Sequence, residues 1–259
     1  MKISNDLLEA YRRDWKLRGK SNFTVNEYIR YLQRLEQIVP EPTLQDVLSW
    51  LDEMTSRSSR RMAARAVRSY GKFMDLAGID FFTWWANVPL APEEVTPQKT
   101  VTMAHVNIAR RTAGNIRDHA LIELLWATGM RRSEISALQI EDVNLAERSV
   151  LIRSSKTGRP RRVPLSLEAA KVLQGLIGSR NSGSLFELSP CGISAVLKRL
   201  DLPSAHAWRR GWAVWSLQSG VSEASVRVVA GWSTGAMVSR YTAALAEELA
   251  MAEFARVSA

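Results

Sequence analysis

The sequence predicts a mainly α-helical protein of two domains, the second of which contains a small antiparallel β-sheet. Apolar residues recur at helical spacing along most of the 259-residue chain. A stretch from Asn87 to Pro97, with three prolines in nine residues, interrupts this pattern and is typical of a linker. Beyond it, short strand-like segments flank the turn-forming residues 154–160, as in a β-hairpin. We therefore expect domains at residues 1–92 and 93–259.

Four helices are expected in the first domain, at about residues 5–17, 24–38, 43–54 and 58–76. Thr24 with Glu27 forms a candidate capping box at the start of the second helix, and Thr43 with Asp46 opens the third. Gly78 ends the fourth. Two tryptophans before the linker, at positions 84 and 85, are expected to close the core of this domain.

The fourth helix carries basic residues on one face, with no acidic residue between Glu53 and Asp75. A solvated helix face normally mixes signs, so this pattern favours a helix that follows DNA phosphates over a merely solvated one. The residues concerned are Arg57, Arg61, Arg65, Arg68 and Lys72.

The second domain alternates helices with a small sheet. Helices are expected at about 103–112, 117–127, 131–138, 167–177, 192–200, 205–219, 223–230 and 243–256. Two or three strands are expected, at 142–144, 149–152 and 161–164.

Composition narrows the function classes. The net charge of +9 and a pI near 10.0 favour a polyanionic partner. A single cysteine, Cys191, argues against a disulfide scaffold and a thiolate metal site, and no apolar run suggests a membrane span. The three histidines have no metal-ligand spacing, and no glycine-rich phosphate loop or nucleophile elbow occurs. We therefore expect a cytoplasmic protein with no metal or cofactor and no membrane partner.

Several residues could act together on a phosphate without a metal. His206 and Arg209 lie at i and i+3 on one helix face, and Arg131 follows the helix-ending Thr128-Gly129 pair. Lys156 lies at the tip of a basic hairpin, and Tyr241 lies near the C-terminus. The hairpin arginines expected to bind DNA are Arg153, Arg159, Arg161 and Arg162. Each of these residue types alone is more often a surface charge or a packing group, so the prediction depends on their order along the chain.

Five segments, four of which contain these residues, resemble the boxes of the tyrosine recombinase (phage integrase) family. Residues 127–138 (ATGMRRSEISAL) resemble the first-arginine box, and residues 154–165 (SSKTGRPRRVPL) resemble the lysine hairpin. The remaining three are His206-Ala-Trp-Arg209, Ala230-Gly-Trp232-Ser-Thr and Val238-Ser-Arg-Tyr241-Thr. Trp232 stands where histidine is commoner, and Arg210 stands where relatives often carry histidine.

This resemblance implies a reaction. Tyr241 would attack the scissile phosphate and form a 3′-phosphotyrosyl link with release of a 5′-hydroxyl. Arg131 and Arg209 would hold the non-bridging oxygens, and Lys156 would protonate the departing oxygen. Tyr241 would need phosphate-centred activation or a nearby base, for which His206 is the candidate. The resemblance further implies that Trp232 donates its indole N–H and packs the nucleophile's surroundings, and that Glu134 supports Arg131.

The same resemblance implies an architecture. Residues 1–92 would be a helical core-binding (SAM-like) domain and residues 93–259 a tyrosine recombinase catalytic domain, without an arm-binding domain. The partner would be double-stranded DNA, on which the protein assembles into a tetramer. The predicted helix 243–256 would dock on a neighbouring protomer or pack on its own.

We expect a site-specific recombinase, namely a phage or mobile-element integrase that works through a four-way junction. A Xer-type chromosome or plasmid dimer resolvase would carry the same boxes, and a type IB topoisomerase a similar catalytic group. A DNA-binding regulator on an inactive scaffold is disfavoured by the complete residue set. Trp208, Trp212 and Trp215 form a helical stripe, for which we favour core packing over base stacking.

Overall fold

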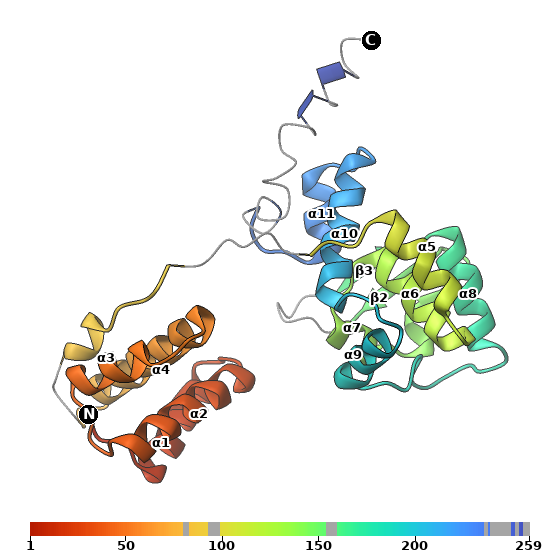
Figure 1. Ribbon diagram of the computed structural model, residues 1–259. Coiled ribbons are helices and arrows are strands. Elements are labelled where there is room, and N and C mark those ends of the chain that lie inside the picture. The colour runs from red at the N-terminus through yellow and green to blue at the C-terminus, as the bar shows by residue number, and fades with distance from the viewer. Residues whose placement is uncertain are drawn as a thin grey trace. The chain divides into compact units, whose positions relative to one another are not determined.

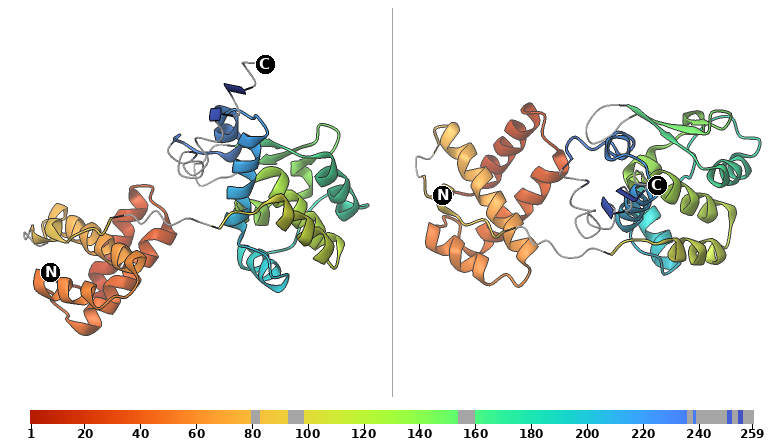
Figure 2. Two further views of the ribbon diagram at one scale, coloured as in Figure 1. Left: turned by 45° about the horizontal axis from the view of Figure 1, so that its top comes forward. Right: turned by 90° about the horizontal axis from the view of Figure 1, so that it is seen from above.

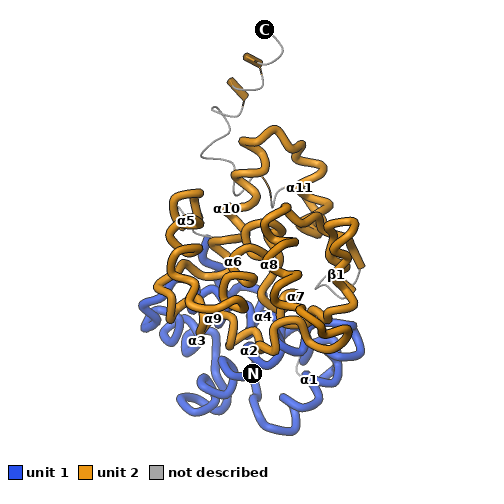
Figure 3. Tube along the Cα trace, turned by 90° about the vertical axis from the view of Figure 1, so that its right-hand side faces the viewer, with its two compact units in different colours: residues 1–96 blue, residues 97–259 orange. Residues whose placement is uncertain are grey.

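The computed structural model describes residues 1–79, 83–92, 99–153, 160–235, 238, 250–251 and 254–255. The chain forms two compact units, residues 1–96 and 97–259 (Figure 3). The division falls four residues after the boundary expected from the prolines. No helix in the described ranges is long and apolar enough to cross a membrane.

Unit 1 is helical, as predicted (Figure 1). Its elements are α1 (Asn5–Leu17), α2 (Asn22–Ile38), α3 (Leu44–Asp52), α4 (Arg57–Leu76) and the 3-10 turn η1 (Trp84–Asn87). The core is built around aromatic rings: Tyr11 and Tyr70 meet edge to face with centroids 5.5 Å apart. Trp84 packs against this core, and Trp85 lies so close to Gly71 that a Cβ there would sit 2.4 Å from its side chain.

In unit 1 the starts of α3 and α4 are capped by side chains, and one predicted cap is wrong. The capping box at Thr43 and Asp46 is confirmed, since the Thr43 N–H donates to the Asp46 carboxylate at 2.8 Å and the Asp46 N–H to the Thr43 hydroxyl at 3.3 Å. The predicted box at Thr24 is wrong. Helix α2 begins at Asn22 after Ser21, and the Thr24 N–H already donates to the Ser21 carbonyl within the first turn.

Unit 2 has the predicted mixture of helices and one small sheet. The strands β1 (Val143–Asn144), β2 (Ser149–Ile152) and β3 (Arg161–Pro164) pair antiparallel in the order β1-β2-β3, with Val150 opposite Val163. Asp142, expected in the first strand, instead ends the 3-10 turn η2 (Ile140–Asp142). The helices are α5 (Met103–Thr112), α6 (Ile116–Thr128), α7 (Arg132–Ala137), α8 (Leu167–Ile177), α9 (Pro190–Arg199), α10 (Ala205–Gln218) and α11 (Glu223–Ala230). The predicted helix 243–256 lies almost entirely outside the described residues.

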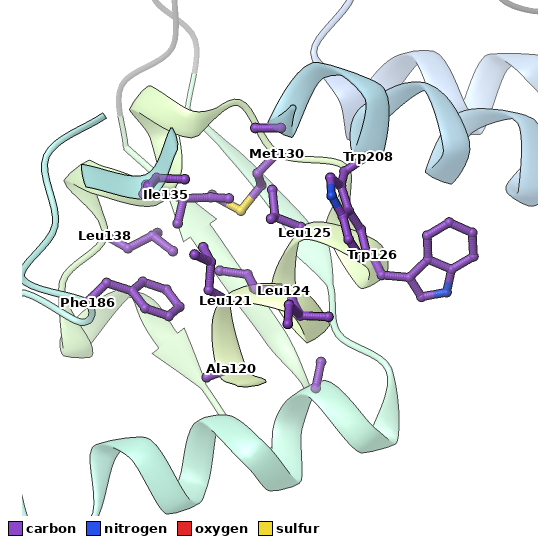
Figure 4. Packing of buried hydrophobic residues seen from close by; sticks show 14 of the residues in the cluster. Ala120, Leu121, Leu124, Leu125, Trp126, Met130, Ile135, Leu138, Phe186 and Trp208 are labelled. Atoms are coloured by element: carbon purple, nitrogen blue, oxygen red, sulfur yellow. The ribbon is translucent and has the colours of Figure 1, made fainter. Parts of the chain in front are cut away.

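Helix α6 is the centre of unit 2. It is apolar around most of its circumference and packs between α8 and α10 (Figures 1 and 2). Leu121, Leu124 and Leu125 of α6 face a core completed by Ile135 of α7 and Trp208 of α10 (Figure 4). Burying α6 in this way fixes where its C-terminal turn, and the arginine after it, must lie.

Candidate active site

The described part of unit 2 contains a pocket of about 350 Å³ that joins the starts of α7 and α10. Three of the predicted site residues, Arg131, His206 and Arg209, line it although up to 78 positions separate them in the sequence. The other lining residues are Arg132, Ser133, Ser194, Ser204 and Ala205. Its charged lining is cationic, so the pocket suits an anion.

Arg131 is held at the N-terminus of α7 by a carboxylate from the same helix. Its guanidinium Nη1 donates to Glu134 Oε1 at 2.8 Å, while its backbone N–H donates to Glu134 Oε2 at 2.9 Å. Glu134 occupies the third position of the helix, from which a glutamate reaches back to the residue before the helix. This short-range chemistry fixes the conformation of Arg131 at the pocket wall.

A second arginine, Arg161 of β3, shares the same carboxylate. Its two terminal nitrogens donate to the two oxygens of Glu134 at 3.1 and 2.9 Å, and its Nε donates to the carbonyl of Val229 at 2.8 Å. Burial alone would raise the pKa of Glu134, but hydrogen bonds from Arg161 and Arg131 outweigh it, and the pKa is lowered.

The place of Arg161 corrects the sequence prediction. We expected it on the DNA-facing surface, yet only 9% of its side chain is exposed and its guanidinium points inward to Glu134 and Val229. The alternation of β3 explains this, because side chains on successive residues of a strand face opposite sides. Arg162, the next residue, is exposed and pairs with Glu147 at 2.9 Å.

Arg209 is buried, with 2% of its surface exposed, on the inner wall of the pocket. Its Nη1 donates to the carbonyl of Gly129 and its Nη2 to the carbonyl of Ala230, both at 2.6 Å. The guanidinium carbon lies 4.9 Å from the ring centroid of Trp232, a cation–π contact. Trp232 thus packs beneath Arg209 within a small cluster that includes Trp212.

His206 stands at the mouth of the pocket and reaches solvent. Surrounding protein atoms reduce the solvation of its charged form, and the guanidinium groups of Arg210, Arg209 and Arg131 repel it further. Both effects lower the pKa of His206, so the imidazole is neutral at physiological pH and can accept a proton.

Arg210 has a role that the sequence did not reveal. Its Nε and Nη2 donate to the carbonyl of Lys99 at 3.1 and 2.7 Å, and the Val101 N–H donates to the carbonyl of Ala207 at 3.3 Å. A Cβ on Gly211 would lie 2.2 Å from the Val101 carbonyl oxygen. The first described residues of unit 2 are therefore fastened to α10 beside the pocket.

The remaining predicted residues are only partly placed. Lys156, Arg159 and Tyr241 lie outside the described residues. Arg153 is exposed and pairs with Asp142. On α4, three members of the basic face are exposed, namely Arg57, Arg65 and Lys72.

The other two members of the α4 face depart from the prediction. Arg61 and Arg68 are partly buried and donate to the carbonyls of Ala91 and Val88. These two side chains attach the segment after η1 to α4, so only part of the basic face of α4 is accessible to a partner.

The tryptophan stripe of α10 divides between two environments. Trp208 and Trp212 are buried, as favoured from the sequence. Trp215 is 42% exposed and contacts Trp126 of α6 with ring centroids 5.5 Å apart. Among the described residues, no group of three His, Cys, Asp or Glu side chains could hold a metal ion.

A helical unit is followed by a helical unit with a three-stranded sheet, in which two arginines and a histidine meet at one pocket. This arrangement suits the binding of a phosphate. The phage integrase family model matches residues 96–248, which include all six residues of the predicted catalytic set. The chain therefore belongs to the phage integrase family of tyrosine recombinases.

Individual relatives span nearly the whole chain. Tyrosine recombinase XerA of Pyrococcus horikoshii is 27% identical over 260 residues, which cover 93% of this chain and 90% of the relative. Tyrosine recombinase XerC of Roseiflexus castenholzii is 28% identical over 281 residues, covering 92% and 88%.

Solved structures share the fold. A lambda integrase dimer bound to a COC′ core site has a TM-score of 0.76 at 16% identity and covers 91% of this chain and 76% of that one. The Tn1549 transposon integrase in complex with transposon right end DNA has a TM-score of 0.72 at 16% identity, covering 98% and 99%. At these identities the likeness concerns the fold.

Proposed function

We propose that this protein is a site-specific DNA recombinase that cleaves and rejoins DNA strands through Tyr241. The observation that carries the proposal is the pocket in which Arg131, His206 and Arg209 meet. Membership of the phage integrase family supports the same conclusion.

The reaction is a pair of transesterifications. The Tyr241 oxygen attacks the scissile phosphorus, the bond to the 5′-oxygen breaks, and a 3′-phosphotyrosyl link forms. A 5′-hydroxyl from the partner strand reverses these steps and releases the tyrosine. Each step exchanges one phosphodiester for another, so no energy source is consumed.

Within this reaction the arginines would neutralise the charge that builds on the non-bridging oxygens, which is the largest contribution that a preorganised site makes. Neutral His206 would accept the tyrosine proton. Lys156 would donate a proton to the departing 5′-oxygen, as the family resemblance implies. Trp232 would hold Arg209 in place through its ring, and its indole N–H would be a further hydrogen-bond donor in the site.

Double-stranded DNA would be held by exposed cations around the pocket and on α4. Arg132 lies beside Arg131 and donates to the Ser194 hydroxyl at 2.8 Å on the pocket rim, which suits a phosphate next to the scissile one. Exposed Arg57, Arg65 and Lys72 of α4 would follow the backbone in unit 1.

A tetramer on two DNA sites, with helix 243–256 docked on the neighbouring protomer, would complete the assembly. The lambda integrase that shares the fold is a dimer on its core site, which is consistent with assembly on DNA. The DNA substrate would be a chromosome or an episome, so the protein would act in the bacterial cytoplasm.

Two biological uses fit this chemistry, with a phage or mobile-element integrase as our main proposal. The names XerA and XerC of several relatives favour dimer resolution as the second candidate. Recombination assays on plasmids separate them: an integrase joins two different attachment sites from its flanking DNA, whereas a resolvase excises the segment between two identical direct repeats.

The chemistry itself is tested by trapping the covalent intermediate. Duplexes from the DNA that flanks the gene, nicked so that the 5′-hydroxyl fragment diffuses away, should give a protein–DNA adduct stable to denaturing electrophoresis. The Tyr241→Phe variant should form no adduct but should still bind DNA. No adduct from the wild-type protein, or an adduct with Tyr241→Phe, would refute the proposal. Relaxation of a supercoiled plasmid without any such site would favour the topoisomerase alternative.

A further inference from the structure

A continuous path of hydrogen bonds leads from Arg131 to α11. Arg131 donates to Glu134, Glu134 accepts a two-pronged hydrogen bond from Arg161, and Arg161 Nε donates to the carbonyl of Val229 at 2.8 Å. Three separate elements, α7, β3 and α11, are thus joined by one side chain, that of Arg161.

The path closes on itself through the second catalytic arginine. Ala230, the residue after Val229, accepts from Arg209 at 2.6 Å, and Arg209 also donates to Gly129, two residues before Arg131. Both arginines of the pocket therefore belong to one ring, in which the hydrogen bonds of Arg131, Glu134, Arg161 and Arg209 are closed by two stretches of backbone, residues 129–131 and 229–230.

The guanidinium of Arg161 packs closely against the turn after α11. Gly231 has a φ of +64°, and a Cβ there would lie 3.0 Å from both the guanidinium carbon and Nη1 of Arg161. Only a glycine combines that backbone conformation with so close an approach. The guanidinium lies against the turn that leads directly to Trp232, the residue beneath Arg209.

We propose that Arg161 is a positioning residue that sets the separation of Arg131 and Arg209 across the phosphate pocket. The planar guanidinium of Arg161 donates to both oxygens of Glu134 with its terminal nitrogens and to the Val229 carbonyl with its Nε. A lysine has a single ammonium group and cannot make this two-pronged contact. Loss of these hydrogen bonds would remove the connection between α7 and α11 through β3 and leave the two elements linked through Arg209 alone. A displacement of about 1 Å in a catalytic group can cost about 10²-fold in rate.

Arg161→Lys tests this role, with Arg110→Lys as the matched control. Arg110 also holds a buried carboxylate with two nitrogens, donating to Glu123 at 2.6 and 2.9 Å, but Glu123, unlike Glu134, holds no arginine of the pocket. The two variants lose the same kind of interaction in the same unit. Thermal unfolding would establish that both are folded at the assay temperature.

The consequence for cleavage rests on the proposed function, so two readouts are needed. With saturating nicked DNA, Arg161→Lys should form the covalent adduct about 10²-fold more slowly while DNA affinity stays within about threefold. Arg110→Lys should cleave at the wild-type rate. Equal rates for Arg161→Lys and wild type, or equal losses in both variants, would overturn the proposal.

The second readout does not depend on recombination. Burial lowers the pKa of His206 most, and the charges of Arg210, Arg209 and Arg131 lower it further. A change in the positions of Arg131 and Arg209 should therefore shift the His206 titration, followed by NMR, in Arg161→Lys, whereas Arg110→Lys should leave it unchanged. An unchanged His206 titration in Arg161→Lys would refute the positioning role. A shifted titration in a protein that forms no adduct even as wild type would refute the recombinase function alone.

Discussion

Replacing Gly129 by alanine should damage both stability and catalysis, because two demands meet at this residue. Gly129 ends α6 in the left-handed region, with φ +56° and ψ 25°, and a Cβ would lie 2.3 Å from Trp212 Cε3 and 2.5 Å from Cδ2. The left-handed conformation costs an alanine about 1–2 kcal/mol, and forcing extra volume into a packed core costs about 1–3 kcal/mol. We therefore expect Gly129→Ala to lower the free energy of unfolding by about 2–5 kcal/mol.

Gly78→Ala provides the matched control. Gly78 has a φ of +65°, but a Cβ added there would meet nothing within 4 Å, so only the backbone cost of about 1–2 kcal/mol applies. Urea denaturation of each variant gives the two free energies. Equal losses would refute the argument that contact with Trp212 fixes this turn.

Gly129→Ala should also slow covalent adduct formation, since the Gly129 carbonyl accepts from Arg209. Residual cleavage can be compared at a temperature where the variant is folded. A folded variant with wild-type cleavage would show that the carbonyl does not set the position of Arg209.

Three further outcomes are expected. Arg132→Ala should weaken DNA binding and reduce the slope of log K against log salt by about 0.9, as for one lost phosphate contact, with the cleavage rate at saturation unchanged; an unchanged slope would argue against that contact. Thr43→Ala should cost unit 1 about 1 kcal/mol in urea denaturation, since it removes the α3 cap, and a loss near zero would contradict the cap's role. The folded-state pKa of Glu134 is lowered, so its stabilising contribution is complete above its ordinary pKa of 4.5 and is lost as pH falls through the folded value. The stability difference between wild type and Glu134→Gln should therefore shrink below about pH 4.5, and a difference constant with pH would refute this coupling.

Local chemistry made most elements predictable. Helix α1 occupies the expected residues, and the Thr43 box and Gly129 mark helix ends, because a capping box joins residues three positions apart and a left-handed helix end favours glycine. The start of α2 was misplaced because Ser21 and Thr24 are both plausible first residues, and the sequence pattern does not distinguish them.

The roles of individual arginines were less accessible. Arg61, Arg68 and Arg161 belong to basic patterns in the sequence, yet their guanidinium groups bind carbonyls or a carboxylate of the protein itself. The charge of an arginine can be read from the sequence, but the groups that these arginines bind lie 20 to 68 positions away along the chain.

The order of the boxes by itself determined the class of chemistry and named Arg131, His206 and Arg209, since residue types and their local context suffice for that. Only the tertiary structure decided how the arginines are held. Gly129, Val229 and Ala230 contribute backbone carbonyls, which every residue possesses and no sequence pattern marks. Their use depends on the burial of α6 against α10 and of α11 against β3, and long-range packing of that kind arises only when the chain folds.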